Sequence, residues 1–582
     1  MTNTLAPTAS TGNSTGNPTN TNTETNTAAN PPSQPEDEDP QKNNTPPKKK
    51  LINLLRGWPA PALLPAAGLQ AAASAVLSDP ELAVPVLQYG IDPGFQPLRE
   101  EVARWLGGVY SWGGAWGRNE GSGGEGGGGG SCGAEGKGGS GGSGGSGGGS
   151  ETAARGGNIT ADEITITGGA SQALATVLQG FTDPGYTRAV WVVAPCYFMA
   201  CPIFEDSGFR GRLRAVPEDE AGVDVGVLER KLKECEAEPW ENHPSKHPYP
   251  DRKLYRHVIY LVATCANPSG KTMPLARRQQ LVHLARLHDA LIISDDVYDL
   301  LQWPVAPTPT PLTTPSPFIP PLPLLSQIDA ALPPSPHEPH HHHHHPDSPT
   351  NPNSPPIFGH AISNASFSKL VGPGVRTGWL HGSAGFAAGF AATGTNRSGG
   401  AASQFAAAVV WRFLSERGEG EGLEAHVEGV VRPALRRRHA LMVGEVRRVL
   451  VGLGVGVWGG NGVGGVGVGL EEGGGGEGER GEVYGGYFVW LTLPEGVDAE
   501  VVAEWARVEE ELVVAPGRIF EVAGDEAAVK FPRNLRLSFS WADEEDIVEG
   551  VERLGRVVRR VLEGESGVVG DGAGSVDTGE FK

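Results

Sequence analysis

An amine and a guanidinium stand close together in the segment that begins at Ser366. Lys369 follows two hydroxyl residues, Ser366 and Ser368, and Arg376 comes after the Gly/Pro turn that starts at Gly372. A lysine amine can capture an aldehyde as a Schiff base, and the hydroxyls and the guanidinium can hold an anion. An isolated lysine is more often a solvated surface charge. The hypothesis of a reactive amine therefore depends on the rest of the chain.

Two patterns before Lys369 suit an anion and an aromatic ring. Ala170 and Ser171 follow two glycines at an expected strand-to-helix turn, where free backbone amides bind anions and glycine allows close approach. A glycine pair there is more often only a tight turn. Tyr197 follows the apolar run that ends near Val193, so its ring could stack over a flat heteroaromatic ring. Without context, a core or surface tyrosine is the commoner interpretation.

Two further patterns follow apolar runs. Asn267 opens the turn sequence Asn-Pro-Ser-Gly after one run, and Asp295 and Tyr298 end the next run. The first is a good β-turn by itself, but at the end of a buried strand its amide would point into a crevice. A carboxylate there is costly without a cation, and a protonated pyridine nitrogen would be one. Asp296 receives no role, and surface capping is its default interpretation. The five patterns together indicate a site for pyridoxal phosphate, which carries an aldehyde, a pyridine ring and a phosphate.

The elements that must position these residues alternate between strand and helix. Strands are expected at 164–167, 189–193, 258–263 and 290–293, and helices at 97–106, from about 171, and at 275–287. The strand runs lack alternation, which is typical of a parallel sheet buried on both faces. We therefore expect a large doubly wound, mostly parallel α/β domain with its site at the carboxyl ends of the strands. Helices at 401–414, 427–451 and 544–562 and strands at 487–493 and 535–539 predict a smaller α+β domain.

Low-complexity segments interrupt this pattern. We expect disorder in an N-terminal arm (1–50), a Gly/Ser-rich insertion (111–156), a Pro/His-rich insertion (304–356), a Gly-rich insertion (452–486) and a tail (566–582). The remaining segments are an N-terminal part with dimer and small-domain contacts (51–110), the large cofactor-binding domain (157–303 and 357–400) and the small domain (401–565). The run His340–His345 could bind metal, but its Pro-rich flanks favour a solvated tract, so we expect no metal site.

Charge and composition exclude several classes of partner. The chain has 582 residues, with 47 basic and 68 acidic residues and a net charge of −21, which disfavours nucleic acid. Its five cysteines show no metal-ligand spacing and suit a reducing compartment. The N-terminus has no apolar signal core, and no apolar run is long enough to span a bilayer. We expect a cytoplasmic protein with no membrane and no nucleic-acid partner.

The five ordered patterns resemble those of the class I and II aminotransferase family, which belongs to the fold-type I pyridoxal phosphate enzymes. The resemblance covers about residues 51–110 and 157–565, and the run from Asp295 to Trp303 is most similar to fungal enzymes akin to 2-aminoadipate and aromatic aminotransferases. It implies the fold of a fold-type I transferase. It also implies a pyridoxal 5'-phosphate-dependent transfer of an amino group from an L-amino acid to a 2-oxo acid.

The resemblance also implies a role for each matched residue. Lys369 would form the Schiff base and carry the proton, while Asp295 would keep the pyridine nitrogen protonated. Tyr197 would stack on the ring, and Asn267 and Tyr298 would bind its phenolate oxygen. The phosphate would be held by Ala170, Ser171, Ser366, Ser368 and Arg376. Arg536 would grip the substrate α-carboxylate, and Asn267 would also bind the substrate. Tyr89 would reach the phosphate of a neighbouring subunit, which makes the expected assembly a homodimer.

Two alternatives stay open. A carbon–sulfur lyase or an enzyme similar to aminocyclopropane-carboxylate synthase would share the same motifs, because only the later chemistry differs. A non-enzymatic alternative is an effector-sensing module of the kind fused to DNA-binding domains. The first 50 residues are not expected to form a winged helix, and the negative charge opposes DNA binding.

Overall fold

A computed structural model of the protein describes residues 49–110, 159–246, 250–305, 319–338, 356–418, 420–458 and 482–564. Several predicted features lie outside these residues: nearly all of the arm 1–50, the insertion 111–156, the run His340–His345, the centre of the Gly-rich segment and the tail 566–582. Their predicted disorder stays a prediction. All elements below belong to one unit, Lys50–Lys582.

A large eight-stranded sheet lies at the centre of the fold, in the order β2-β10-β9-β7-β6-β3-β4-β5. Its strands are β2 (Ile164–Thr167), β3 (Ala189–Ala194), β4 (Leu213–Asp219), β5 (Gly222–Val223), β6 (His257–Leu261), β7 (Ala290–Asp295), β9 (Ala361–Ser366) and β10 (Gly378–His381). The five strands from β9 to β4 run parallel, whereas β10 is antiparallel to both neighbours and β5 is antiparallel to β4. The predicted mostly parallel α/β sheet is confirmed.

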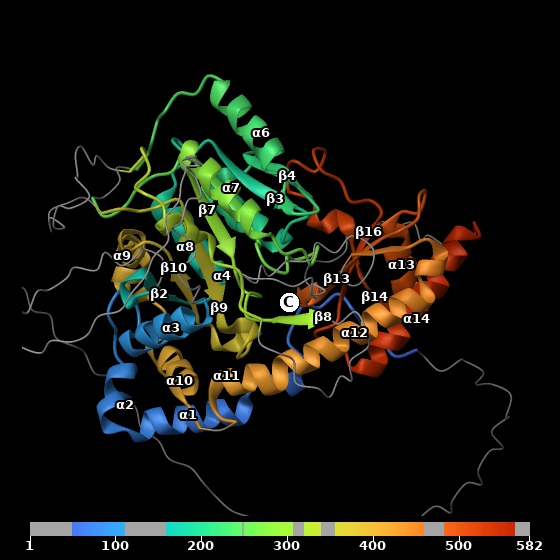
Figure 1. The fold of residues 1–582 in the computed structure, drawn as a ribbon, viewed down its shortest axis with the longest axis horizontal. Coiled ribbons are helices and arrows are strands. Elements are labelled where there is room, and N and C mark those ends of the chain that lie inside the picture. Colours follow the sequence, from blue (N-terminus) through green and yellow to red (C-terminus); the bar gives the residue numbers. More distant parts are fainter. Residues whose placement is uncertain are drawn as a thin grey trace, which may run out of the picture. The chain divides into compact units, whose positions relative to one another are not determined.

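Helices cover both faces of this sheet (Figure 1). Side chains such as Val190 and Leu291 pack in one apolar cluster with α4 (Ala170–Phe181) and α9 (Ala384–Ala391). Their neighbours Trp191 and Ile292 pack in another cluster with α6 (Val225–Ala237) and α7 (Leu275–Leu287). Successive strand residues face opposite sides, and both sides are buried. This two-sided burial explains why the strand sequences lack polar alternation.

Strand register brings the predicted site residues to one edge of the sheet. Asp295 at the end of β7 pairs with Asn364 of β9, so Ser366 ends its strand on the same side. Lys369 follows within one turn, in the short 3-10 helix Phe367–Lys369. Strand β2 also ends at this edge and leads into α4 at Ala170. The carboxyl edge of the sheet therefore collects the residues that the motifs singled out.

A second sheet is built from the C-terminal part of the chain, in the order β11-β13-β16-β15. These strands are β11 (Gly456–Trp458), β13 (Phe488–Thr492), β15 (Ala515–Pro516) and β16 (Asn534–Ser538). The long helix α12 (Arg432–Val449) packs against α14 (Glu544–Leu562), and α14 also contacts α13 (Ala499–Glu510) (Figure 1). This sheet is separate from the large one, as expected for a smaller α+β part, although the predicted domain boundaries stay predictions.

The N-terminal segment connects to both parts. β1 (Ile52–Asn53) pairs in parallel with β14 (Leu512–Val513) of the C-terminal part. Helix α1 (Ala66–Ser78) and α3 (Gln96–Val109) pack on α10 (Gln404–Ser415). The other short helices are α2 (Pro80–Val86), α5 (Cys201–Phe204), α8 (Leu325–Ala330) and α11 (Gly422–His426). Residues 51–58 thus contact C-terminal strands that come near the other end of the sequence.

Parts of two insertions that were predicted to be disordered are ordered in the structure. Residues 319–338, within the predicted insertion 304–356, include α8, and Leu324 and Leu325 there are buried. Composition suggested disorder because proline dominates, but a short leucine-rich stretch packs on α7 and β9 and stabilises the helix. The ends of the Gly-rich segment 452–486 are also ordered, since β11 begins at Gly456 and β12 (Glu482–Gly485) pairs with β8 (Gln302–Val305).

Most predicted elements agree with the structure within a few residues. The helices expected at 275–287 and 544–562 coincide with α7 and α14. The helix expected at 401–414 begins only at Gln404, because the Ser403 hydroxyl accepts a hydrogen bond from the Ala406 amide and caps it. The helix expected at 427–451 is continuous with α11 through a π-helical turn, Val427–Val431. None of the helices in the described ranges is long and apolar enough to cross a membrane.

Candidate active site

One cavity of about 250 Å³ lies at the carboxyl edge of the large sheet, between that sheet and the C-terminal strands. Every predicted site residue except Tyr89 lines it. These residues are Ala170, Ser171, Tyr197, Asn267, Asp295, Tyr298, Ser366, Ser368, Lys369, Arg376 and Arg536. The chain therefore brings together groups that stand as far apart in sequence as residues 170 and 536.

Lys369 is a buried amine held by its own turn. The Ser366 hydroxyl oxygen caps that turn by accepting a hydrogen bond from the Ser368 amide at 3.1 Å. The Lys369 Nζ donates to the Gly57 carbonyl at 2.8 Å. Burial lowers the pKa of Lys369 to about 8, with Arg536 acting in the same direction and Asp295 opposing it. A substantial fraction of the amine is consequently neutral near pH 8, which is the form that attacks a carbonyl carbon.

Asp295 is the last residue of β7, and only one of its two carboxylate oxygens has a hydrogen-bond partner among the described residues. Its Oδ2 accepts a hydrogen bond from the Tyr260 hydroxyl at 2.8 Å. Its Oδ1 is buried and has no hydrogen-bond partner among the described residues. Burial raises the pKa of Asp295 to about 6, although Tyr260 and Lys369 favour the ionised form. A protonated pyridine nitrogen at Oδ1 would satisfy this group and stabilise its charge, so the carboxylate fits the predicted cofactor.

The phosphate end of the cavity is formed by α4 and Arg376. Gly169 precedes α4 with a φ of 102°, and a Cβ there would lie 2.6 Å from the Nη2 of Arg376. Arg376 itself has a left-handed φ of 50°, and its Nη2 donates to the Gly168 carbonyl at 2.8 Å. The first amides of a helix have no intrahelical acceptor. Together with the nearby serine hydroxyls, this helix N-terminus and the guanidinium form a cradle that fits a phosphate.

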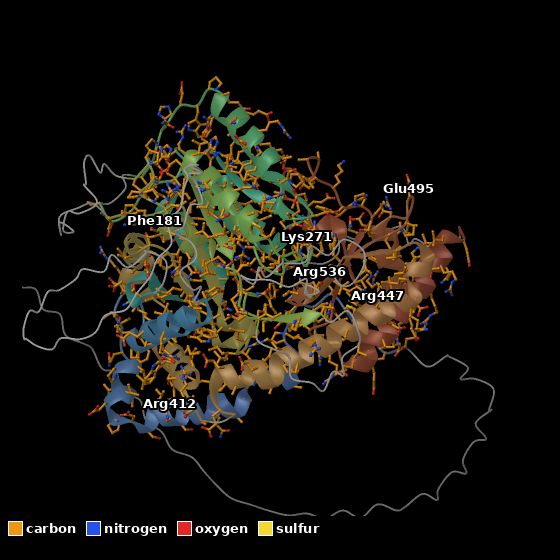
Figure 2. All side chains as sticks on the ribbon, in the orientation of Figure 1. Phe181, Lys271, Arg412, Arg447, Glu495 and Arg536 are labelled. Atoms are coloured by element: carbon orange, nitrogen blue, oxygen red, sulfur yellow. The ribbon has the colours of Figure 1, made fainter. Side chains whose placement is uncertain are left out.

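Arg536 reaches the cavity from β16 of the C-terminal sheet. Its Nη1 donates to the Asn267 Oδ1 at 2.8 Å, and its Nη2 donates to the Leu55 carbonyl at 2.6 Å. The guanidinium carbon lies 4.0 Å from the centre of the Phe488 ring. Burial lowers the pKa of Arg536 to about 10, which leaves it charged at neutral pH. Figure 2 labels Arg536 near the C-terminal strands, and its bond to Asn267 joins it to the turn that follows β6. A fixed guanidinium here can bind a carboxylate.

Two tyrosines supply the aromatic surfaces of the cavity. Tyr197 lies at the turn after β3, and burial raises the pKa of its hydroxyl to about 12, so the phenol stays neutral. Tyr298 is buried against Tyr487 and Phe488, at ring-centre distances of 5.4 and 6.2 Å. Burial raises the pKa of Tyr298 well above its ordinary value. Both hydroxyls therefore remain available as hydrogen-bond donors.

Tyr89 is the predicted site residue that lies elsewhere. Its side chain is 87% exposed, and it lines a separate surface pocket with Arg397 and Gln404. It does not touch the cavity of its own chain. Its predicted contact with the phosphate of a neighbouring subunit stays a prediction.

Sequence patterns missed one wall of the cavity. Leu55, Arg56, Gly57 and Trp58 line it from the N-terminal segment. Their backbone carbonyls accept hydrogen bonds from Arg536 at Leu55, from Lys369 at Gly57 and from the Ser540 hydroxyl at Trp58. Such pairings depend on long-range folding. The only local signal was a lone arginine within an apolar stretch. Tyr260, the donor to Asp295, was missed for the same reason.

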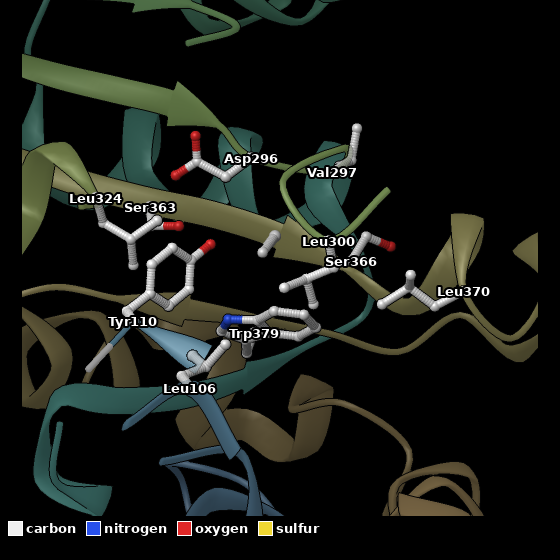
Figure 3. A pocket seen from close by; sticks show the side chains of 11 residues that line it. Leu106, Tyr110, Asp296, Val297, Leu300, Leu324, Ser363, Ser366, Leu370 and Trp379 are labelled. Atoms are coloured by element: carbon white, nitrogen blue, oxygen red, sulfur yellow. The ribbon is translucent and has the colours of Figure 1, made fainter. Parts of the chain in front are cut away.

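Two further aspartates, Asp296 and Asp299, are buried close to Asp295 in the sequence. Asp296 and Tyr110 line a small cavity beside Trp379, and Asp296 faces it from the end of β7 (Figure 3). The Tyr110 hydroxyl donates to Asp299 at 2.9 Å. Burial raises the pKa of Asp296 to about 7, and the nearby Asp299 adds to the effect. Asp296, for which no role was expected, is buried, so the default interpretation as a surface cap does not apply.

Comparison with known sequences finds similarity to aminotransferases. Residues 152–311 match the family model for aminotransferase class I and II. The uncharacterised protein YER152C of Saccharomyces cerevisiae is 29% identical, over 88% of this chain and 98% of its own length. Aromatic-amino-acid aminotransferase 1 of Thermococcus litoralis is 24% identical, over 88% of this chain and 89% of its own length.

Solved structures show the same fold. The multiple substrate aminotransferase of Thermococcus profundus superimposes with a TM-score of 0.58 at 23% identity, covering 89% of this chain and 94% of its own. LysN, the alpha-aminoadipate aminotransferase of Thermus thermophilus, was crystallised with N-(5'-phosphopyridoxyl)-L-leucine. It gives a TM-score of 0.56 at 23% identity, with 88% of this chain and 94% of that chain covered.

The residues of the cavity agree with these comparisons. The unpaired oxygen of Asp295, the partly neutral amine of Lys369 and the anion cradle at α4 together fit a pyridine ring, an aldehyde and a phosphate. The described residues contain no cluster of His, Cys, Asp and Glu that could hold a metal ion. Residues 152–311 thus match the class I and II aminotransferases, the chain has the fold of the fold-type I enzymes, and its cavity fits pyridoxal 5'-phosphate as the cofactor.

Proposed function

We propose that this protein is a transaminase that moves an amino group from an L-amino acid to a 2-oxo acid in two half-reactions. One observation carries the proposal: a buried amine of lowered pKa, Lys369, shares a cavity with the carboxylate of Asp295 and the guanidinium of Arg536. The cofactor, when bound, supplies the electron sink that makes the Cα–H bond of an amino acid acidic. The protein residues supply binding, orientation and proton transfer.

Each of these residues has a defined task. Arg536 would bind the α-carboxylate with its two guanidinium nitrogens and so set the direction of the Cα–H bond. Lys369, as a neutral amine, would accept the proton from Cα of the substrate and deliver it to the cofactor. Asp295 would hold a proton at the ring nitrogen, since its free oxygen faces the cavity. The phosphate cradle at α4 and Arg376 would anchor the opposite end.

We propose 2-aminoadipate or an aromatic amino acid as the donor, and 2-oxoglutarate as the acceptor. The names of two similar proteins, an aromatic-amino-acid aminotransferase and an alpha-aminoadipate aminotransferase, support this choice. The residues that bind the α-carboxylate do not discriminate among donors, because every α-amino acid carries that group.

We further propose a cytoplasmic homodimer. The 87% exposure of the Tyr89 side chain, outside its own cavity, supports a role across a subunit interface. The cytoplasmic location is supported by the sparse, odd set of cysteines in the sequence. Sedimentation of wild-type protein and of Tyr89→Phe, with cofactor retention measured for each, tests the assembly. A wild-type monomer that retains the cofactor fully would contradict it.

A single half-reaction tests the proposed activity. Purified protein loaded with pyridoxal phosphate should convert one equivalent of cofactor to the pyridoxamine form when an amino donor is added without acceptor. A panel of 2-aminoadipate, aromatic, branched and acidic donors should then be assayed against 2-oxoglutarate. Continuous release of ammonia or of a thiol without acceptor would instead identify a lyase, and absence of any turnover would favour a binding module.

A further inference from the structure

We propose that Arg56 binds the distal carboxylate of a dicarboxylic substrate and thereby determines specificity. The proposal rests on the proposed function and adds a second anion-binding group to it. Arg56 lines the same cavity as Arg536 and Lys369. It would act on the side chain of an amino acid such as 2-aminoadipate or glutamate, and on the far end of a 2-oxo diacid.

The backbone around Arg56 is fixed by the two groups that handle the reacting end of the substrate. The Leu55 carbonyl accepts from Arg536 and the Gly57 carbonyl accepts from Lys369. Before this, the Asn53 Oδ1 accepts from the amides of Leu55 and Arg56, each at 3.0 Å. Consecutive Cα atoms are about 3.8 Å apart, so the Arg56 side chain starts one residue from the α-carboxylate site. This position suits the far end of a short substrate.

The surroundings of the Arg56 guanidinium hold it without neutralising it. Its central carbon lies 5.0 Å from the ring centre of Trp58 and 5.5 Å from that of Trp541. The two indoles meet edge to face at 5.5 Å. The Nε is buried, and among the described residues it has no hydrogen-bond partner. Aromatic faces orient a guanidinium, but they leave its in-plane donors free. A planar carboxylate is the partner that such donors fit best.

The other charged residues of the cavity leave Arg56 without a counter-charge, which a distal carboxylate would supply. Arg376 belongs to the phosphate cradle and Arg536 to the α-carboxylate, while Lys369 reacts with the cofactor and Asp295 faces its ring nitrogen. Each of these groups thus has a counterpart in a loaded site. Arg56 is the remaining charged residue in the lining of the cavity. A dicarboxylic substrate would supply its counter-charge, whereas an aromatic or aliphatic side chain would not.

The test compares donors of equal length that differ only in the distal group. L-2-aminoadipate is paired with L-norleucine, and L-glutamate with L-norvaline. In wild-type protein we expect the diacid of each pair to have the higher kcat/KM in the half-reaction. Arg56→Gln should lower kcat/KM for the diacids by about 10- to 100-fold, the size of a charge-assisted hydrogen bond. The values for norleucine and norvaline should stay within about threefold, because they lack the group that Arg56 binds.

A second measurement does not depend on activity. Glutarate and pentanoate are titrated into cofactor-loaded protein, and binding is followed by calorimetry. Wild-type protein should bind glutarate more tightly, and Arg56→Gln should remove that preference. Arg56→Lys should restore part of it, because it keeps the charge but loses the planar fork. Arg507→Gln, which removes an exposed arginine on α13, is the matched control and should change nothing.

The outcomes separate this inference from the proposed function. Equal loss for diacids and monoacids in Arg56→Gln would mean that Arg56 only supports the cavity wall, and unchanged diacid values would mean that it binds no substrate. Either result overturns the inference and leaves transamination intact. A wild type that prefers glutarate, with the preference lost in Arg56→Gln, but that transfers no amino group from any donor would overturn the proposed function alone.

Discussion

The two walls of the cavity differ in how they present their chemical groups. The wall formed by the large sheet offers side chains from strand ends and the turns that follow them, such as Asp295 and Lys369. The wall formed by Leu55–Trp58 offers backbone carbonyls, which hold Arg536 and Lys369 in place. The first wall carries the reaction, and the second positions the groups that perform it. Substitutions in the two walls should therefore fail in different ways.

The largest effect is expected in the sheet wall. Lys369→Ala removes the amine that captures the aldehyde and moves the proton, so kcat should fall by at least about 10²–10⁴-fold from lost proton transfer alone. Borohydride reduction followed by peptide mapping should no longer attach the cofactor to this segment. Lys233→Ala, which removes an exposed lysine paired with Glu229, is the control. Activity retained by Lys369→Ala would remove the central assignment.

The second largest effect is expected from a change at Arg536, and it should distinguish the site for the α-carboxylate from the proposed site for the distal carboxylate at Arg56. Arg536→Gln removes a buried guanidinium that contacts Asn267 and Leu55. It should lower kcat/KM by about 30-fold or more for every amino donor, since a buried charged contact is worth at least about 2 kcal/mol. Unlike Arg56→Gln, it should affect 2-aminoadipate and norleucine alike. Steady-state kinetics with both donors measures this, and selective loss of the diacid would contradict the assignment.

A smaller effect, on the free energy of unfolding, is expected when Gly57 in the wall formed by Leu55–Trp58 is replaced. A Cβ at Gly57 would lie 2.5 Å from the nearest carbon of the Phe488 ring. Gly57→Ala should therefore displace the ring or the wall, lowering the free energy of unfolding by about 1–3 kcal/mol. Thermal unfolding monitored by calorimetry measures the change. Gly108→Ala is a matched control, because a Cβ there meets nothing within 4 Å. An unchanged unfolding temperature in Gly57→Ala would show that the wall is not tightly packed.

The smallest effect concerns the acidity of the amine that both walls contact. The pKa of Lys369 is lowered to about 8, and a lysine reacts only when neutral. The rate at which apoprotein captures pyridoxal phosphate should therefore rise with pH, with a midpoint near 8, and level off above it. Arg536→Gln should move the midpoint up, because a repelling cation is lost, whereas Asp295→Asn should move it down. Stopped-flow absorbance across pH 6–10 tests this, and a midpoint near 10.5 would contradict burial of the amine.

Much of the sheet wall could be predicted from sequence because its residues lie next to the strands that position them. Asn267 and Asp295 each come at the end of a short apolar run, and parallel strands bring such ends to one edge. Lys369 was found instead from the serines and the arginine close to it in the sequence. The wall formed by Leu55–Trp58 could not be predicted, since its contacts join residue 55 to 536 and residue 57 to 369. No local pattern encodes such pairs. The helix α8 was missed for the opposite reason, because the proline content around it outweighed a short leucine-rich stretch.

The carbonyls of Leu55 and Gly57 are separated by only two peptide units, yet one accepts from Arg536 and the other from Lys369. A carboxylate that drew Arg536 toward itself would compete with the first bond, and a Lys369 amine that bound the cofactor would give up the second. Both events act on the same short stretch of main chain. Binding of a carboxylate by Arg536 and reaction of the Lys369 amine would therefore both change the hydrogen bonds of the main chain between Leu55 and Gly57.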